Sequence, residues 1–254
     1  MQSVQVVGYQ PGRPDEPGAL EIAGNGEVTV QKLSPGSDLE YGLGNRHCAG
    51  AVSDGVHAAC EEDDAPYCEL HSSVWPCARC RGDCAMPLES CHEEHAIYLA
   101  GFEPATFKVG VTKSYRLERR LGEQGARRGA HIRTVENGQI ARQIEAEMAE
   151  DIPDRITLPT KIDGLADSID ESAWETLLEP HDVKTHFEFE YGLDLEHRPI
   201  EGTILSGRVR GTRGRILVLG HSDTLYAVDL KALVGYELKT DAAAPDRQSS
   251  LQAF

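Results

Sequence analysis

All seven cysteines of this 254-residue chain lie between positions 48 and 91, and four histidines lie among or directly after them. Thiolates and imidazoles at the spacings C-x2-H, C-x2-C, C-x3-C and C-x3-H form the short chelating loops that a tetrahedral zinc ion requires. Disulfides are disfavoured in the reducing cytosol that we expect for this chain. The pattern therefore predicts one or two structural zinc sites.

The division of these ligands between two sites is an interpretation of their spacing. The expected ligands are Cys48, Cys60, Cys68 and His71 for one site, and four of Cys77, Cys80, Cys84, Cys91 and His95 for the other. An iron–sulfur cluster held by four of the later cysteines is one alternative, although the interleaved histidines favour zinc. Buried or redox-active cysteines without metal are the other alternative.

The residues that follow, 96–150, predict a strand, a turn, a second strand, a helix, a third strand and a second helix. Ser114 is suited to cap the first helix and Gly125 to end it, and Asn137 is suited to cap the second. The side chains with chemical potential on these elements are, in chain order, Tyr98, Lys108, Arg120 and Glu145. Structural interpretations are open for three of them: Tyr98 as a packed aromatic, Arg120 as a solvated charge, and Glu145 as a surface partner of Arg142 or Arg128.

The order of these residues resembles the GIY-YIG nuclease superfamily, with AIY at 96–98 and KVG at 108–110 as its two signatures. Arg120 lies ten residues past that glycine, and Glu145 matches the helix glutamate of the superfamily. The chain is also similar to an uncharacterised archaeal and bacterial family, catalogued as a domain of unknown function, in its segments CHEEHAIYLA, KVGVT, RRLGEQGA and ARQIEAEM. That family couples a cysteine-rich stretch to such a module.

The resemblance implies a metal-dependent phosphodiester cleavage with one role for each residue. Glu145 would hold Mg²⁺ or Mn²⁺, and Arg120 would bind the scissile phosphate through its planar guanidinium. Tyr98 would position or deprotonate the attacking water, and Gly110 would allow the backbone to approach closely. Lys108 stands where the second signature carries a tyrosine. Cleavage therefore depends on whether Lys108 can replace that tyrosine, whereas binding does not.

The chain carries a formal charge of −17 with only seven lysines, and its acids are scattered along the sequence. This pattern is typical of proteins from a very salty cytosol. Against that background, residues 107–134 hold eight Lys or Arg and two Glu, a local charge of +6, and residues 207–215 hold four Arg and no acid. The expected nucleic-acid-binding residues are Lys113, Arg116, Arg119, Arg127, Arg128, Arg208, Arg210, Arg213 and Arg215. Solvation or pairing with the abundant acids is the alternative for these arginines.

We expect a multidomain α+β protein with a GIY-YIG-like three-stranded antiparallel sheet and flanking helices, preceded by a cysteine-rich zinc segment and flanked by small β regions. The expected divisions are an N-terminal β unit at 1–47, the zinc segment at 48–95, the module at 96–155, a C-terminal helix (at 167–179) with a β-sheet or small barrel at 156–240, and a disordered tail at 241–254. The C-terminal β region can pack with the N-terminal strands.

The leading functional expectation is a nucleic-acid-binding protein, acting on DNA or RNA, with GIY-YIG-type endonuclease activity. One alternative is a catalytically inactive RNA-binding or ribosome-associated zinc protein that uses the same arginine-rich surface, and another is a zinc-dependent scaffold for protein partners. The sequence has no run of 18 apolar residues and no signal-peptide pattern at its start. We therefore expect a cytoplasmic protein without a membrane role.

Overall fold

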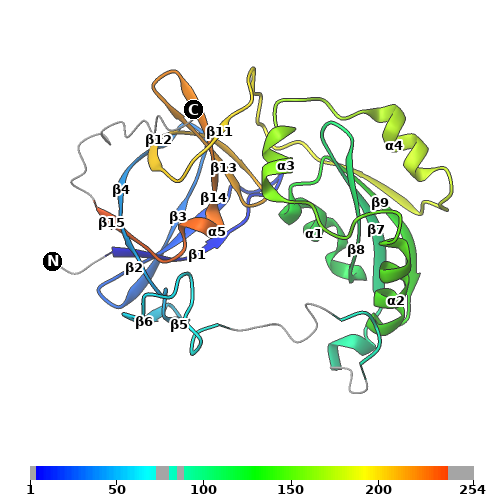
Figure 1. Cartoon of the computed structure of the whole chain (residues 1–254), viewed down its shortest axis with the longest axis horizontal. Coiled ribbons are helices and arrows are strands. Elements are labelled where there is room, and N and C mark those ends of the chain that lie inside the picture. The colour runs from blue at the N-terminus through cyan, green and yellow to red at the C-terminus, as the bar shows by residue number, and fades with distance from the viewer. Residues whose placement is uncertain (1–3, 73–79, 85–88, 240–254) are drawn as a thin grey trace, which may run out of the picture.

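The computed structural model of the protein describes residues 4–72, 80–84 and 89–239. Its strands form two separate sheets, one of eleven strands and one of four. Figure 1 shows the larger sheet with blue N-terminal and orange C-terminal strands side by side, and the smaller sheet with the green central strands. None of the described helices is long and apolar enough to cross a membrane.

The larger sheet draws its strands from both ends of the chain. They are β1 (Val4–Gln10), β2 (Ala19–Gly24), β3 (Glu27–Lys32), β4 (Asp38–Arg46), β5 (Ala51–Ser53), β6 (Val56–Ala58), β11 (Ile200–Glu201), β12 (Leu205–Arg213), β13 (Ile216–His221), β14 (Thr224–Asp229) and β15 (Tyr236–Lys239). Their spatial order is β11-β14-β13-β12-β4-β15-β1-β2-β3-β6-β5, and every pair is antiparallel except β11 with β14. The first and last thirds of the chain thus share one sheet.

Two tight turns of this sheet follow directly from the sequence. Asn25 and Gly26 join β2 to β3 with φ of 54° and 81°, and Asp54 and Gly55 join β5 to β6 with φ of 51° and 80°. Two consecutive residues with positive φ make the type I′ turn that matches the twist of a hairpin, and Asn-Gly and Asp-Gly favour it. Apolar side chains of β1, β2, β4, β12, β13, β14 and β15 meet in one core that the curved sheet surrounds, together with the short helix α5 (Leu230–Leu233).

The smaller sheet has the order β10-β9-β7-β8 and is antiparallel throughout. Its strands are β7 (His95–Phe102), β8 (Thr106–Lys113), β9 (Arg128–Val135) and β10 (Thr185–Glu188). Alternate residues of β7 face opposite sides. Tyr98 and Phe102 pack with α1 (Leu117–Gln124), whereas Ile97 and Leu99 share a core with residues of α2 (Gly138–Met148) and α4 (Glu171–Leu178). The remaining helices are α3 (Leu158–Asp163) and the 3-10 turns η2 (Glu89–His92) and η3 (Ser114–Arg116).

The predicted helix ends are confirmed in two cases. Gly125 ends α1 in the left-handed conformation, and the Asn137 side chain accepts a hydrogen bond from the backbone of Ile140 at the start of α2. Ser114 does not cap α1, because it begins the short turn η3 and α1 starts only at Leu117. The helix expected at 167–179 is present as α4, with Asp170 as its cap.

The predicted fold class is wrong. The chain is not a GIY-YIG-like three-stranded α+β module between small β regions, because its largest unit is the eleven-stranded sheet and the central sheet has four strands. The N-terminal and C-terminal β regions, which we expected to be able to pack together, form this one sheet by pairing β4 with β12 and β15 and β1 with β15. β10, expected among the C-terminal strands, pairs instead with β9. The predicted tail at 241–254 lies outside the described residues.

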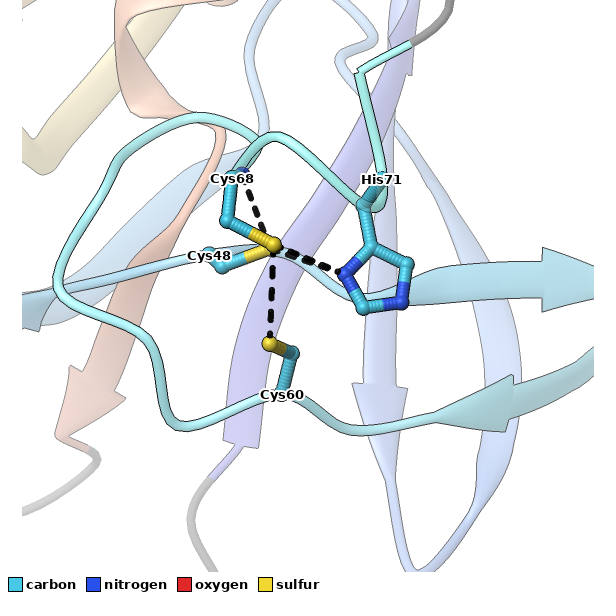
Figure 2. A group of neighbouring side chains, drawn as sticks. All are labelled: Cys48, Cys60, Cys68 and His71. Carbon is cyan, nitrogen blue, oxygen red and sulfur yellow. Dashed lines mark hydrogen bonds between the residues drawn. The ribbon is translucent and has the colours of Figure 1, made fainter.

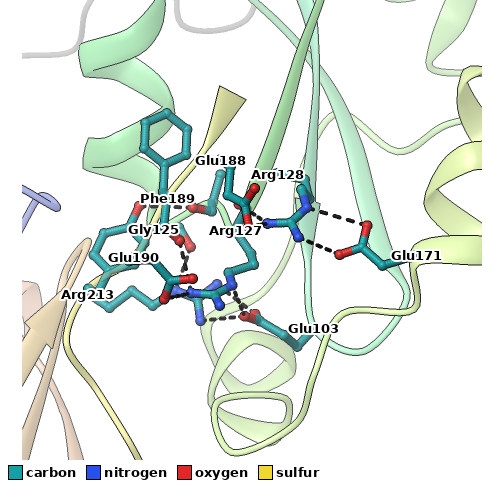
Figure 3. A network of polar contacts seen from close by, with 11 residues as sticks. Glu103, Gly125, Arg127, Arg128, Glu171, Glu188, Phe189, Glu190 and Arg213 are labelled. Carbon is teal, nitrogen blue, oxygen red and sulfur yellow. Dashed lines mark hydrogen bonds and ion pairs between the residues drawn. The ribbon is translucent and has the colours of Figure 1, made fainter. Parts of the chain in front are cut away.

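A buried ion pair fastens the two sheets to each other. Arg213, at the end of β12, donates two hydrogen bonds to the carboxylate of Glu103, in the turn between β7 and β8, at 2.9 and 2.6 Å. Its Nε also donates to the backbone oxygen of Gly125, at the end of α1, at 2.8 Å. Figure 3 shows Arg213 and Glu103 between the two parts of the molecule.

Candidate functional site

The first cluster brings together Cys48, Cys60, Cys68 and His71, the four residues expected to form one metal site. Their ligand atoms all lie within 4.8 Å of one another, and Figure 2 shows them pointing at a common centre. The Cys60 and Cys68 sulfurs are 3.9 Å apart, and Nδ1 of His71 lies 3.2 Å from the Cys68 sulfur and 3.4 Å from the Cys48 sulfur. A tetrahedron with metal–sulfur bonds of about 2.3 Å has edges of about 3.8 Å. The cluster therefore has the composition and dimensions of a metal site such as zinc.

Backbone amides support the thiolate of Cys48. The amides of Gly50 and Cys68 donate to its sulfur at 3.4 and 3.3 Å. Burial disfavours the charged form, but these donors outweigh it and lower the pKa of the Cys48 thiol. Gly50 has a φ of 66°, and a Cβ there would lie 2.1 Å from the backbone oxygen of Ala58. Only glycine fits this turn.

The ligands proposed for the second site are not gathered in the same way. Cys77 lies outside the described residues, and within the described part of the chain Cys80, Cys84, Cys91 and His95 form no further group of three metal-binding side chains. The amide of Gly82, whose φ is 83°, does donate to the Cys80 sulfur at 3.3 Å, as Gly50 does to Cys48.

The four residues matched to the nuclease signatures line one cavity. Tyr98 from β7, Lys108 from β8, Arg120 from α1 and Glu145 from α2 surround a space of about 600 Å³. Gly110 lines it as well. Cys80, Cys91 and His95 of the cysteine-rich segment lie along another part of its wall. The sequence order of the four residues therefore corresponds to a real convergence in space.

Tyr98 is held firmly at the inner end of this cavity. Its side chain is buried, and its hydroxyl accepts a hydrogen bond from Nε2 of Gln124 at 2.6 Å. The ring lies over Gly110, its partner on β8, where a Cβ would come within 2.5 Å of the ring. Burial raises the pKa of the Tyr98 hydroxyl, so the phenol is protonated at neutral pH. In that state it can position a water or phosphate oxygen by donating a hydrogen bond.

Lys108 and Glu145 supply opposite charges to the cavity. Nζ of Lys108 donates to the backbone oxygen of Asp154 at 2.6 Å, and burial lowers the pKa of the Lys108 amine. Glu145 is half-buried, and one carboxylate oxygen accepts a hydrogen bond from Arg142 at 2.7 Å. This agrees with the structural interpretation of Glu145 as a partner of Arg142. Its other oxygen accepts no hydrogen bond from the described residues, which leaves it available to a ligand.

Arg120 is the more accessible of the two cations among these four residues. Its side chain is half exposed, and the nearest carboxylate, that of Glu123, lies 3.9 Å from its Nη1. Such a long contact leaves most of its donors free for an anion. Two other expected nucleic-acid-binding residues, Lys113 and Arg116, line the same cavity, although Lys113 also pairs with Glu93 at 2.6 Å.

The other expected arginines divide into paired and exposed groups. In the network of Figure 3, Arg127 pairs with Glu190 and Glu103, Arg128 pairs with Glu171 and Glu188, and Arg213 is buried against Glu103. Arg119 pairs with Glu123 and Arg215 with Asp229. Arg208 and Arg210 are exposed on one side of β12, because Val209 between them points into the core.

Sequence reasoning missed Gln124 and Lys161, which lie at or beside the cavity. Gln124 lies one helical turn after Arg120, so the helix assignment contained a signal for it. Lys161 had none, because α3 is a six-residue helix that was not among the helices expected from the sequence.

Comparison with known proteins gives a family and no function. No curated protein and no solved structure matches the chain. A family model described as "Protein of unknown function (DUF2797)" matches residues 44–238, from the end of β4 into β15. This range includes the cysteine cluster, the cavity and most of the C-terminal strands. It confirms the resemblance to an uncharacterised family, and the chain belongs to the DUF2797 family.

Proposed function

We propose that the protein binds nucleic acid and cleaves a phosphodiester bond in the cavity formed by Tyr98, Lys108, Arg120 and Glu145. The observation that carries this proposal is the convergence of these four residues, from four different elements, on one space of about 600 Å³. Their likeness in type and order to the GIY-YIG signatures is the second support, and it concerns the site rather than the whole fold.

The cavity offers the groups that phosphodiester hydrolysis needs. The half-buried Glu145 carboxylate suits Mg²⁺ or Mn²⁺, hard ions that accept one protein carboxylate with water as further ligands, and such an ion would polarise the phosphate. Arg120 binds the phosphate and stabilises the charge that develops on its oxygens. Tyr98, protonated, orients the attacking water. Lys108 occupies the position of the missing tyrosine, and burial lowers the pKa of its amine, which favours the neutral form that can accept a proton.

We propose that the four-residue cluster of Cys48, Cys60, Cys68 and His71 holds a structural Zn²⁺. A second Zn²⁺ would use four of Cys77, Cys80, Cys84, Cys91 and His95, and the amide-to-sulfur turn that Cys48 and Cys80 share supports it. Free thiolates need a reducing compartment, which favours the cytoplasm. The charge of −17 favours a cytosol rich in salt.

A second candidate is a nucleic-acid-binding protein without cleavage, for example one that associates with the ribosome. The lysine at position 108 favours it, because the nuclease signature carries a tyrosine there. The same cations would then bind the backbone of an RNA.

The decisive experiment measures cleavage of labelled single-stranded and structured RNA and DNA with Mg²⁺ or Mn²⁺ in concentrated KCl. We expect Glu145→Gln and Arg120→Ala each to lower the rate by at least about 100-fold, the usual cost of losing one transition-state contact. Glu147→Gln is the matched control, because this exposed glutamate lies on the same helix and does not line the cavity.

Equal product from the wild type and both cavity variants would refute cleavage at this site. Binding that survives Glu145→Gln and weakens in Arg120→Ala, without any product, would favour the second candidate.

A further inference from the structure

A second cavity adjoins the first at the contact between the two sheets. It has a volume of about 390 Å³ and shares Arg120 and Gln124 of α1 with the first cavity. Lys161 of α3 lines it from the side of the smaller sheet, and Tyr9 of β1 and Arg215 of the β12–β13 turn line it from the larger sheet. The two parts of the molecule thus build this space together.

Lys161 is a half-buried cation without an acidic partner. Its Nζ donates to the backbone oxygen of Gln124 at 2.8 Å and lies 4.0 Å from the centre of the Phe102 ring. No carboxylate of the described residues lies within ion-pair distance of it. Burial and the nearby cations Lys108, Arg213, Arg215 and Arg120 lower the pKa of Lys161 to about 7.

The acids near Lys161 already pair with arginines. Glu103 is bound by Arg213, and Asp229 pairs with Arg215 at 3.0 Å. Glu123 lines the cavity but lies 2.7 Å from Arg119. Among the described residues that line this cavity, the remaining titratable group is Tyr9, whose pKa is raised by burial.

A chain of charge −17 therefore keeps several cations together in a partly buried place where they repel each other. This arrangement costs folding free energy, since neither burial nor mutual repulsion favours a charged lysine. An external anion would remove that cost.

The cations continue beyond this cavity. A third space, of about 850 Å³, shares Tyr9 and Arg215 with the second and is also lined by Lys231. Tyr67, partly exposed, lines it too and offers an aromatic face. Spaced cations with aromatic side chains along a groove are the usual means of binding a single nucleic-acid strand.

We infer that the second cavity is a phosphate-binding subsite in which Lys161, Arg120 and Arg215 hold a neighbouring phosphate of the strand that occupies the first cavity. This inference rests on the proposed function and extends it by naming a ligand, a single-stranded nucleic acid that crosses from the smaller sheet to the larger one. A single inorganic phosphate would use the same donors, so the test separates the two.

The test measures the affinity of inorganic phosphate and of single-stranded oligonucleotides, from one nucleotide to several, without divalent ions. Wild-type affinity should increase in a step once the oligonucleotide spans both cavities. Lys161→Met keeps the stem packed on Phe102 and should remove that step, weakening longer oligonucleotides about tenfold, the usual effect of one charge-assisted contact. The substitution should also reduce the slope of log affinity against log salt concentration by about one, the value expected for one lost phosphate contact.

Two further variants control for structure and charge. Lys184→Ala removes an exposed lysine that bonds to Thr134 and lines neither cavity, so it should bind as the wild type does. Lys161→Arg keeps its charge at every pH. Wild-type affinity for long oligonucleotides should decline as pH rises through and above about 7, where Lys161 loses its proton, whereas Lys161→Arg should show no such decline.

The outcomes are distinct. Equal affinities for Lys161→Met and Lys184→Ala, or the same pH-dependent decline in Lys161→Arg, would overturn the subsite. If phosphate binding depends on Lys161 but the affinity shows no step with oligonucleotide length, the single-stranded ligand is refuted and a small-anion site remains. A step that depends on Lys161 in a protein that never cleaves would support the subsite while refuting cleavage. If no oligonucleotide binds, both proposals fall.

Discussion

Replacing Glu103 by glutamine should destabilise the protein far more than the loss of an ordinary surface ion pair. The side chains of Glu103 and Arg213 are only 7% and 8% exposed, and they share two hydrogen bonds of 2.9 and 2.6 Å. Arg213 also stacks on Tyr191, with the guanidinium 5.2 Å from the ring centre. The substitution removes the negative charge and leaves a buried guanidinium without its counter-ion.

The magnitude follows from the burial and the number of bonds. Breaking one side of a buried pair costs about 3–5 kcal/mol. Glutamine keeps one acceptor oxygen but replaces the other with an NH2 donor, so at least one charge-assisted hydrogen bond of about 1.5–3 kcal/mol is lost. Domains are stable by about 5–15 kcal/mol, so the loss is a large fraction of the total. With a urea dependence of about 2 kcal/mol per molar, a loss of about 4 kcal/mol lowers the midpoint by about 2 M.

The assay is equilibrium unfolding in urea at low and high KCl. The matched control is Asp163→Asn, which breaks the exposed pair between Asp163 and Arg198 and should cost no more than about 1 kcal/mol. Salt should reduce the small effect of the control and leave the Glu103→Gln effect nearly unchanged, because a buried pair is poorly screened. A loss below about 1 kcal/mol for Glu103→Gln, or one equal to the control, would refute this reasoning.

Two further predictions concern the candidate sites. Cys68→Ala should lower bound zinc by about one ion per chain in elemental analysis, whereas Ser72→Ala, a nearby exposed residue, should keep it; unchanged zinc would remove Cys68 from the site. Gly110→Ala should cost about 1–3 kcal/mol in urea unfolding, because its Cβ would lie 2.5 Å from the Tyr98 ring. Gly24→Ala is the control, since the nearest atom there is 3.8 Å away, and equal losses in the two variants would contradict the steric argument.

The sequence predicted those features whose cause is local. The cap at Asn137 and the end of α1 at Gly125 depend on the preferences of a few neighbouring residues. The set of Cys48, Cys60, Cys68 and His71 was also predicted correctly, because chelating side chains in one short segment have few alternative partners. Ligand type and spacing carried that information.

Features that depend on distant pairing were not visible in the sequence. Nothing in β4 specifies β12 and β15 as its neighbours, since alternating apolar residues suit many partner strands. Likewise, a run of arginines does not indicate which acids they pair with. The sequence could not identify Glu103 as the partner of Arg213, because the two residues are 110 positions apart. Lys161 became a candidate only when three elements enclosed it.

The shared sheet also constrains the order in which the chain can fold during synthesis. β1 needs β15 on one side, and β4 needs β12 and β15 as its two neighbours, so these early strands wait for residues near 239. At about 5–20 residues per second, that wait lasts on the order of 10–50 s. The smaller sheet is complete once β10 has emerged and can fold first. Meanwhile the unpaired edges of β1 and β4 are open to other chains, so a nascent-chain chaperone would act most usefully on the first fifth of this protein.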